Sequence, residues 1–385
     1  MVWEADQVDD VCFVEYGTRV VKKRDGGTIY PVYGGGGATF FMDESNREDC
    51  LIISRFAMSE KCTRFVKGKF FLNDSGLSII SKNENELCQE FLNYQILSLN
   101  DYIYSLARGT AQKNLNVPKF RKMDIHFPKS IDEQKRIVAI LDEAFENITK
   151  AKENAEKNLK NANKIFESYL QSIFENKGEG WAEKKLGGIC SLITKGSSPK
   201  WQGIKYVEEP GVLFITSENV GEYQLILENR KFVENRFNLK DKKSILQKGD
   251  VLTNIVGASI GRTAMYTLDD VANINQAVCI LRCKPEFISN IYLMNLLNSP
   301  YMKEILHKNE VNNARANLSL TFFSNLSVPL PPLSEQQVIV TKLGALSSET
   351  KRLEAVYEKK LADLEELKKS ILAKAFNGEL TEASA

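Results

Sequence analysis

The sequence predicts an α+β fold with two globular domains of mixed helix and strand, joined by two long antiparallel coiled-coil helices and related by a pseudo-two-fold internal repeat. Three observations predict it. The segment Ile131-Asp132-Glu133-Gln134 recurs 202 residues later as Leu333-Ser334-Glu335-Gln336. Apolar residues at helical spacing follow each copy. Strand-like stretches broken by glycine and asparagine precede each copy.

The repeat extends beyond this segment and defines the predicted domains. The offset of 202 still relates Phe174 to Phe376, whereas near the N-terminus Cys12 matches Cys190 at an offset of 178. Asn114-Leu115-Asn116-Val117 matches Asn317-Leu318-Ser319-Leu320 at 203. Because the offset drifts, the two halves differ in their middles. We expect a first variable domain at 1–127, a first constant helical region at 128–178, a second variable domain at 179–328 and a second helical region at 329–385.

The constant regions are predicted to be a matched pair of helices. Each carries an apolar seam with steps of three and four residues. The second seam is Leu343, Leu346, Thr350, Leu353, Tyr357, Leu361, Leu364, Leu367 and Ile371, and the first is Leu141, Ala144, Ile148, Ala151, Ala155, Leu159, Ala162, Ile165 and Tyr169. Leucine facing alanine would interdigitate well. Helices of about 38 residues would span roughly 57 Å, and they act either as a ruler between two binding surfaces or as a hairpin that only joins two domains.

The variable domains mix both kinds of element. Strand-like runs include residues 70–72, 213–216, 250–256 and 277–282, and helical runs cover 87–99 and 288–306. Polar, glycine-rich loops interrupt the strands, and several carry arginine, lysine, asparagine or glutamine. These side chains read base edges in the major groove of DNA, while lysine, hydroxyl and backbone amide groups bind phosphates.

The loops therefore predict a nucleic-acid interface. The candidate DNA-binding residues are Thr18, Arg19, Lys22, Gly35, Gly36, Arg108, Gln112 and Lys113 in the first half, and Lys195, Ser197, Ser198, Lys200, Ser259, Arg262, Arg315 and Asn317 in the second. Two simpler interpretations stay open. Any single loop is also compatible with a solvated turn. The two segments that carry arginine and asparagine just before each repeated block, residues 108–114 and 313–317, are also compatible with a helix N-cap region that orients the domain on its helix.

Composition narrows the function classes. The net charge is +1, and the seven cysteines are scattered, as expected of reduced thiols in the cytoplasm. No apolar run reaches the roughly 18 residues that a membrane span needs, and no Walker A motif or adenine-methyltransferase motif is found. We expect no catalytic residue, no metal site and no cofactor.

At this point the chain resembles the DNA-specificity subunits of Type I restriction–modification systems. The resemblance lies in Pro329-Leu330-Pro331-Pro332-Leu333-Ser334-Glu335-Gln336, in its weaker first copy from Phe127 to Gln134, in the closing segment from Ser370 to Leu380, and in Gly249-Asp250-Val251-Leu252 with Gly257-Ala258-Ser259-Ile260-Gly261. It covers essentially the whole chain. The first half shows no obvious counterpart of the Gly257 to Gly261 segment.

The resemblance implies a non-catalytic subunit with several partners. Such proteins bind a split, asymmetric site in double-stranded DNA, and they recruit two modification subunits that methylate adenine and restriction subunits that translocate and cut DNA. The conserved helices would dock the modification subunits. Two other functions remain open from the residues alone: a coiled-coil scaffold whose heads bind other proteins, which the near-zero net charge suits, and an unrecognised enzyme, for which no catalytic constellation is found.

Overall fold

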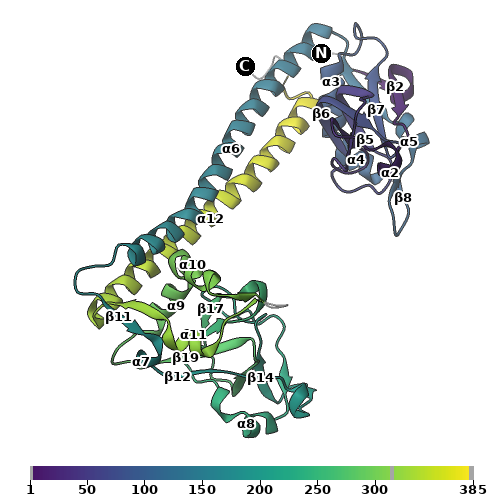
Figure 1. The fold of residues 1–385 in the computed structure, drawn as a ribbon. Helices are drawn as coiled ribbons and strands as arrows, with labels where there is room; N and C mark the ends of the chain where they lie inside the picture. The colour runs from purple at the N-terminus through teal and green to yellow at the C-terminus, as the bar shows by residue number, and fades with distance from the viewer. Residues whose placement is uncertain (1–2, 313–315, 381–385) are drawn as a thin grey trace. The chain divides into compact units, whose positions relative to one another are not determined.

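The computed structural model describes residues 3–312 and 316–380, which form two compact units (Figure 1). Unit 1 contains residues up to 156 and from 358 onwards, and unit 2 contains residues 157–357. Two long helices, α6 (Ile131–Glu175) and α12 (Leu333–Phe376), each contribute one end to each unit. Among the described helices, none is long and apolar enough to cross a membrane.

Unit 1 is built on one six-stranded sheet with the strand order β2-β7-β5-β6-β3-β4. The strands of unit 1, inside and outside this sheet, are β1 (Trp3–Gln7), β2 (Cys12–Tyr16), β3 (Tyr30–Tyr33), β4 (Phe41–Met42), β5 (Arg47–Ser54), β6 (Thr63–Leu72), β7 (Gly76–Ser81), β8 (Ala107–Arg108), β9 (Asn114–Leu115) and β10 (Asp124–Pro128). Its shorter helices are α1 (Val8–Val11), α2 (Lys22–Asp25), α3 (Gln89–Ser98), α4 (Asn100–Ser105) and α5 (Val117–Arg121).

Unit 2 has two four-stranded sheets, ordered β12-β19-β16-β17 and β13-β15-β14-β18. Its strands are β11 (Ala182–Lys185), β12 (Cys190–Lys195), β13 (Tyr206–Val207), β14 (Val212–Ile215), β15 (Phe232–Val233), β16 (Val251–Asn254), β17 (Thr263–Met265), β18 (Ala272–Ile274), β19 (Val278–Cys283), β20 (Val311–Asn312), β21 (Ala316–Asn317) and β22 (Ser327–Leu330). Its shorter helices are α7 (Leu186–Ile189), α8 (Arg236–Lys240), α9 (Asn290–Asn298), α10 (Pro300–Lys308) and α11 (Leu320–Asn325), with single turns η1 (Lys200–Gln202), η2 (Lys242–Ser244) and η3 (Gly257–Ser259).

The predicted α+β class and internal repeat are confirmed by these elements. In each unit a strand pairs antiparallel with the strand that precedes the long helix: β1 with β10, and β11 with β22. A one-turn helix follows at Val8 or Leu186, and its first amide donates to the backbone oxygen of Met123 or Leu326, respectively, at 2.8 and 3.0 Å. Between these paired strands and the long helices the two units differ. The single long strand β6 of unit 1 corresponds to two strands of unit 2, β17 and β18.

The recurring glutamine joins the globular part of each unit to its long helix. In unit 1 the buried Gln134 accepts from the amide of Cys88 at 2.8 Å and donates to the carbonyl oxygens of Glu86 and Pro128. These bonds tie the start of α6 to the segment that leads into α3. A glutamine suits this place because one side chain supplies both an acceptor and two donors.

Unit 2 repeats the glutamine contacts with different neighbours. Gln336 accepts from the amide of Ser289 at 2.8 Å and donates to the oxygens of Phe287 and Pro331, both at 2.9 Å. The side chain is fully buried. The bonds join the start of α12 to the segment before α9, so both halves of the chain use the same attachment.

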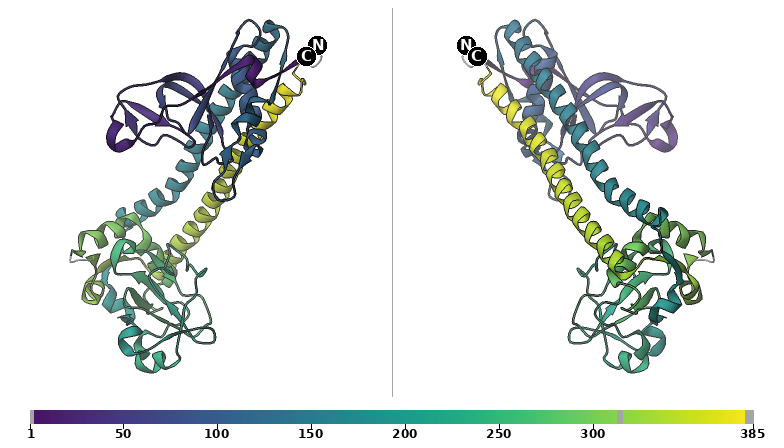
Figure 2. Two further views of the ribbon diagram at one scale, coloured as in Figure 1. Left: turned by 90° about the vertical axis from the view of Figure 1, so that its right-hand side faces the viewer. Right: turned by 90° about the vertical axis from the view of Figure 1, so that its left-hand side faces the viewer.

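The far end of the other long helix completes each core through an aromatic residue. Phe376 of α12 packs edge-on against Phe91 of α3, with ring centroids 5.2 Å apart. In unit 2, Phe174 of α6 packs in the same way against Tyr292 of α9 at 5.8 Å. Each unit therefore pairs the start of one long helix with the end of the other, so the two helices run antiparallel, as Figure 2 also shows.

The predicted seam holds near the start of each long helix, where Leu141 and Leu343 are buried, but it is wrong towards the C-terminal ends. Ile165, Tyr169 and Leu367 are exposed by 47, 37 and 47%. The reason is that each helix end packs against the core of its unit instead of continuing the coiled coil, so the buried face there passes through Phe174 and Leu372. The middle of the predicted seam holds at Ala155, Ala162 and Thr350, which are buried.

The predicted elements of the variable domains fall on observed ones, with one division. The runs at 70–72, 213–216, 250–256 and 277–282 overlap β6, β14, β16 and β19, and the run at 87–99 overlaps α3. The predicted helix at 288–306 is two helices, α9 and α10. Pro300 starts the second one, because proline is tolerated in the first turn of a helix but not in its interior.

Replacement of the buried glutamine should destabilise unit 2. Gln336→Met keeps the side chain's length but leaves the Ser289 amide and two carbonyl oxygens without their partner, and each such buried group costs about 1–3 kcal/mol. We expect urea unfolding followed by circular dichroism to show a loss of about 2 kcal/mol or more. The control is Gln337→Met, because Gln337 is exposed; equal stability of the two variants would contradict the attachment.

Candidate nucleic-acid interface

Five segments of unit 1 gather at one edge, which we call loop edge 1. It consists of residues 17–18, 34–37, 55–58, 73–75 and 113–114. Backbone hydrogen bonds connect them: the amide of Asn73 donates to Tyr33 at 2.8 Å, and the amide of Arg55 donates to Ser75 at 2.8 Å. The Asn73 side chain closes its own turn by accepting from the amide of Ser75 at 2.9 Å. The ends of β2, β3 and β5 and the turn between β6 and β7 thus form one surface.

Unit 2 has an equivalent loop edge 2, made of residues 196–197, 216–219, 255–259, 275–277 and 317–318. The amide of Asn275 donates to Ile215 at 3.0 Å, and the amide of Ile255 donates to Ala277 at 2.9 Å. The Asn275 side chain accepts from the amide of Ala277 at 3.0 Å. Asn73 and Asn275 are 202 residues apart, so the turn at the centre of both edges keeps the offset of the constant regions.

A small hairpin closes each edge. In unit 1 the hairpin of β8 and β9 attaches where the amide of Leu115 donates to Arg55 at 2.9 Å. In unit 2 the amide of Leu318 donates to Ile255 at 2.9 Å, and Asn317 forms a bridge with Val256. The first Arg/Asn segment, residues 108–114, therefore lies on the hairpin of β8 and β9, and Ala316 and Asn317 of the second form β21. Arg315 lies outside the described residues.

The first segment of each edge depends on a glycine. A Cβ atom on Gly17 would lie 2.0 Å from the oxygen of Asn73, and one on Gly196 would lie 1.8 Å from the oxygen of Ile274. Both contacts are too close for any side chain, so these glycines let the strand ends β2 and β12 approach the central turn. Thr18 and Lys195, beside them, are exposed.

The glycine run of unit 1 divides into two parts. Gly35 is buried, its amide donates to the Ser75 hydroxyl at 3.2 Å, and its oxygen accepts from Ser54 at 2.5 Å. A Cβ atom there would meet the oxygen of Phe56 at 2.4 Å. Gly36 is exposed, with open space where a side chain would be. Of the two predicted glycines, only Gly36 is open to a partner.

The basic residues of the first half lie on two projecting turns. Arg19 and Lys22 are exposed, and Lys22 opens the one-turn helix α2. Arg108 lies on the hairpin, where its guanidinium group faces the Asn116 amide, whose oxygen, once oriented towards it, accepts at 2.6 and 2.8 Å. Asn116 immediately precedes the short helix α5, so this contact engages Arg108 within unit 1 and does not involve the long helix α6.

The tip of the same hairpin is polar and accessible. Gln112 and Lys113 are both exposed. The Lys113 ammonium lies 4.4 Å from the centre of the Tyr104 ring, which limits the directions the lysine samples.

The second half presents its polar groups on turns that buried side chains hold. The fully buried Asn254 donates from its amide nitrogen to the oxygen of Ser217 at 2.9 Å and to the Ser259 hydroxyl at 3.1 Å. Gly257 and Gly261 have left-handed backbones with φ of 79 and 85°. Arg262 after them is exposed, and within the part of the chain that the structure describes its side chain has no hydrogen-bond or ion-pair partner.

The remaining predicted residues of unit 2 surround η1. The Ser197 hydroxyl donates to the Asp241 carboxylate at 2.5 Å and is engaged within the protein. Ser198 is half-buried and Lys200 is exposed. Trp201, which is not among the predicted site residues, has a side chain that is 89% exposed on this turn. An aromatic residue between basic residues was the available signal.

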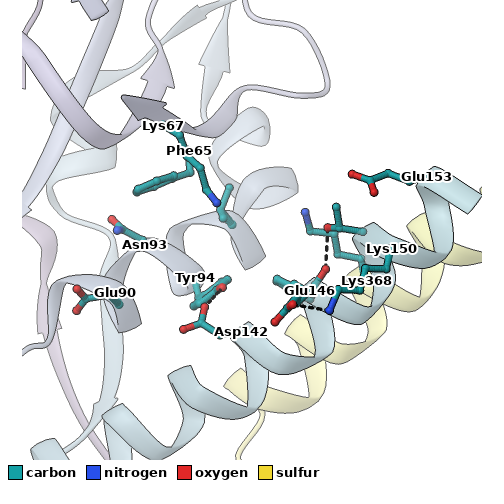
Figure 3. Close-up of a pocket in the computed structure, with 13 residues that line it drawn as sticks. Phe65, Lys67, Glu90, Asn93, Tyr94, Asp142, Glu146, Lys150, Glu153 and Lys368 are labelled. Atoms are coloured by element: carbon teal, nitrogen blue, oxygen red, sulfur yellow. Dashed lines mark hydrogen bonds and ion pairs between the residues drawn. The ribbon is translucent and has the colours of Figure 1, made fainter. Parts of the chain in front are cut away.

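Unit 1 also contains a hollow of about 860 Å³ lined by α3, β6 and the two long helices (Figure 3). Tyr94 of α3 donates to the Asp142 carboxylate of α6. Burial, and then the neighbouring carboxylate, raise the pKa of Tyr94 well above its ordinary value. Lys368 of α12 lies 5.0 Å from the centre of the Phe145 ring. The hollow shares no residue with loop edge 1 and offers mixed charge instead of the cations that bind phosphate.

The family description "Type I restriction modification DNA specificity domain" matches residues 2–160 and 178–363. The chain belongs to this family. The two matched stretches correspond to the two halves of the internal repeat, so the family's specificity domain occurs twice here.

Relatives in this specificity family share moderate sequence identity. The chain is 34% identical over 208 residues to the Type I restriction enzyme EcoBI specificity subunit of Escherichia coli, a match that covers 53% of this chain and 42% of that one. It is 24% identical over 336 residues to the MjaVIII specificity subunit of Methanocaldococcus jannaschii, covering 81% and 76%. The match thus spans less than half of the Escherichia coli protein.

Solved structures support the fold. The HsdS subunit from Thermoanaerobacter tengcongensis aligns over 98% of this chain and 97% of its own, with a TM-score of 0.58 and 20% identity. A chain from a study of complex assembly and conformational transition in a type I R-M system aligns over 98% of both chains, with a TM-score of 0.74 and 20% identity.

Proposed function

We propose that this chain is the sequence-specific DNA-binding subunit of a Type I restriction–modification complex, and that it recognises a bipartite, asymmetric site. The observation that carries the proposal is the duplication of the loop edge. The same five segments meet in both units around equivalent asparagine turns, while the side chains they present differ. Two such surfaces on one chain suit a target with two different halves.

The chemistry of both edges suits a DNA duplex. The exposed residues include Arg19, Lys113, Lys195 and Arg262, which are cations that bind phosphates or base edges. Polar Gln112 and Ser259 accompany them. In this proposal the chain performs no catalysis, needs no cofactor and acts in the cytoplasm, with methylation and cleavage carried out by other subunits.

Partner docking is supported by the exposed apolar residues of the long helices. Ile165 of α6 and Leu367 of α12 are 202 residues apart, and each is 47% exposed. Equivalent apolar positions in a repeated structure offer the same contact twice. We propose that each contributes to the docking of one adenine-N6 methyltransferase subunit, and that the restriction subunits with translocase and nuclease activity join the resulting assembly. A scaffold that binds only proteins remains the alternative, favoured by the net charge of +1.

Lengthening both helices should change the DNA site. One heptad inserted in the middle of α6 and of α12 adds about 10 Å to each helix, so the spacer between the half-sites should grow by about 3 base pairs. Single-molecule methylation sequencing of a host that carries the complete system measures both half-sites and the spacer.

The matched control is a flexible seven-residue insertion between Asn176 and Trp181, outside both helices. The spacer should stay unchanged in that variant. If the two insertions give the same spacer, the helices do not set it. If the unaltered complex methylates no defined sequence, the scaffold alternative gains support.

Charge placed at the two equivalent apolar positions should remove the modification subunits one at a time. Because a buried unpaired carboxylate is costly at an interface, we expect Ile165→Asp and Leu367→Asp each to retain one methyltransferase subunit and the double variant to retain none. Native mass spectrometry of the reconstituted complex measures this stoichiometry. The control is Val356→Asp, whose residue is 48% exposed but has Asn154 at its equivalent position. Full occupancy in the double variant would contradict the proposed docking positions.

A further inference from the structure

The first unit contains a counterpart of the glycine-rich loop after β16 that its sequence does not reveal. Strands β5 and β16 both continue into loop edges, and the residues after them make the same bonds. Arg55 donates to Ser75 and accepts from Leu115, as Ile255 donates to Ala277 and accepts from Leu318. Residues 55–58 therefore occupy, in unit 1, the place of residues 255–258 in unit 2.

The backbone conformation of the two loops agrees with this equivalence. Gly257 has a φ of 79°, and Ala57, which lies 200 residues earlier in the chain, has a φ of 47°. An alanine seldom adopts this left-handed conformation, and such residues persist where their surroundings hold them. Here Ala57 donates to the Asn114 side chain at 3.2 Å, and Met58 donates to the Lys113 oxygen at 2.8 Å.

The held loop presents the aromatic side chain of Phe56 where unit 2 has Val256. The Arg55 guanidinium lies between two rings, 4.8 Å from the centre of Tyr16 and 4.4 Å from that of Phe56. It also donates to the oxygen of Asp74 at 3.1 Å. Arg55 is thus occupied inside the protein, while Phe56 remains 37% exposed at loop edge 1.

The stacking limits what Phe56 can contact. A side chain that wedges between base pairs needs both ring faces, but the cation of Arg55 covers one face of Phe56. The buried Gly35 lies directly behind the oxygen of Phe56, so the loop has little room to retreat. A fixed ring with one free face and an edge suits contact with an apolar group in the major groove, where the thymine C5-methyl is the group that base pairs offer.

We infer that Phe56 contacts the methyl group of a thymine in the half-site bound by unit 1, and that this contact helps to determine its sequence. The inference rests on the proposed function and adds a residue and a base to it. Unit 2 lacks an aromatic residue at the equivalent place, which is Val256. The two units accordingly recognise their half-sites by different means.

Removal of the methyl group tests the contact without altering the protein. In the complex with its methyltransferase subunits, replacing each thymine of the half-sites in turn by uracil should weaken binding about three- to tenfold at one position. Phe56→Ala should weaken binding of the natural duplex by a similar factor and should abolish the difference between thymine and uracil there. Fluorescence anisotropy with labelled duplexes measures both effects.

Three controls make the outcome decisive. Phe56→Leu keeps an apolar contact and should retain part of the discrimination, and Phe41→Ala, which removes a 48% exposed ring elsewhere on unit 1, should leave it intact. A duplex with 5-iodouracil at the sensitive position should photocrosslink to the peptide containing Phe56 in the unaltered protein. This measurement does not depend on whether a variant folds.

The failures of the two proposals differ. Sequence-specific binding that is insensitive to every thymine methyl group, or a crosslink to a peptide outside loop edge 1, would overturn the inference and leave the proposed function standing. Absence of any sequence preference in the unaltered complex would overturn both.

Discussion

A buried glutamine couples the globular part of each unit to the long helix that follows it, and the rest of the structure depends on this coupling. Gln134 and Gln336 each satisfy one amide and two carbonyl groups at the meeting point of a short helix and a long one. Three directed bonds fix orientation in a way that apolar packing does not. These bonds hold the segment before α3 against the start of α6, and the segment before α9 against the start of α12.

This attachment explains how the two units can differ where they do. Gln134 and Phe174, which join the globular part of a unit to a long helix, have their equivalents at an offset of 202. The hairpin residue Leu115 has its equivalent at an offset of 203. Between them, one six-stranded sheet in unit 1 corresponds to two four-stranded sheets in unit 2. Sheets tolerate such changes because the strand ends, and not the whole strands, form the loop edge. An attachment that is the same in both units beneath loop edges that differ is compatible with the proposed recognition of two different half-sites.

The features that could be predicted from the sequence are those that follow from its internal repeat and its apolar periodicity. The repeat placed both long helices. The matched residues Cys12 and Cys190 begin β2 and β12, although no strand was predicted at either position. The seam failed at Ile165 and Leu367, because periodicity identifies an apolar face but not the neighbour that covers it, and these two residues are each 47% exposed. Their exposure is the reason why we propose that these residues take part in docking.

The candidate site was harder to predict, because it depends on backbone conformation. Glycines at 257 and 261 signalled a left-handed loop, whereas Ala57 adopts the same conformation without such a signal. Gly35 was predicted to leave room for a ligand, but the space beside its Cα is taken by the backbone oxygen of Phe56. Likewise, nothing in the sequence showed that Asp241 engages the Ser197 hydroxyl, since the partners are 44 residues apart. Long-range contacts of this kind are visible only in the folded chain.

We propose that both loop edges bind DNA through equivalent segments. Hydrogen exchange measured by mass spectrometry, on the complex with and without its specific duplex, tests it most directly. We expect slower exchange at 55–58, 73–75 and 113–114 and, to a similar degree, at 255–259, 275–277 and 317–318. Protection confined to one unit, or found on the long helices with both loop edges unchanged, would contradict it.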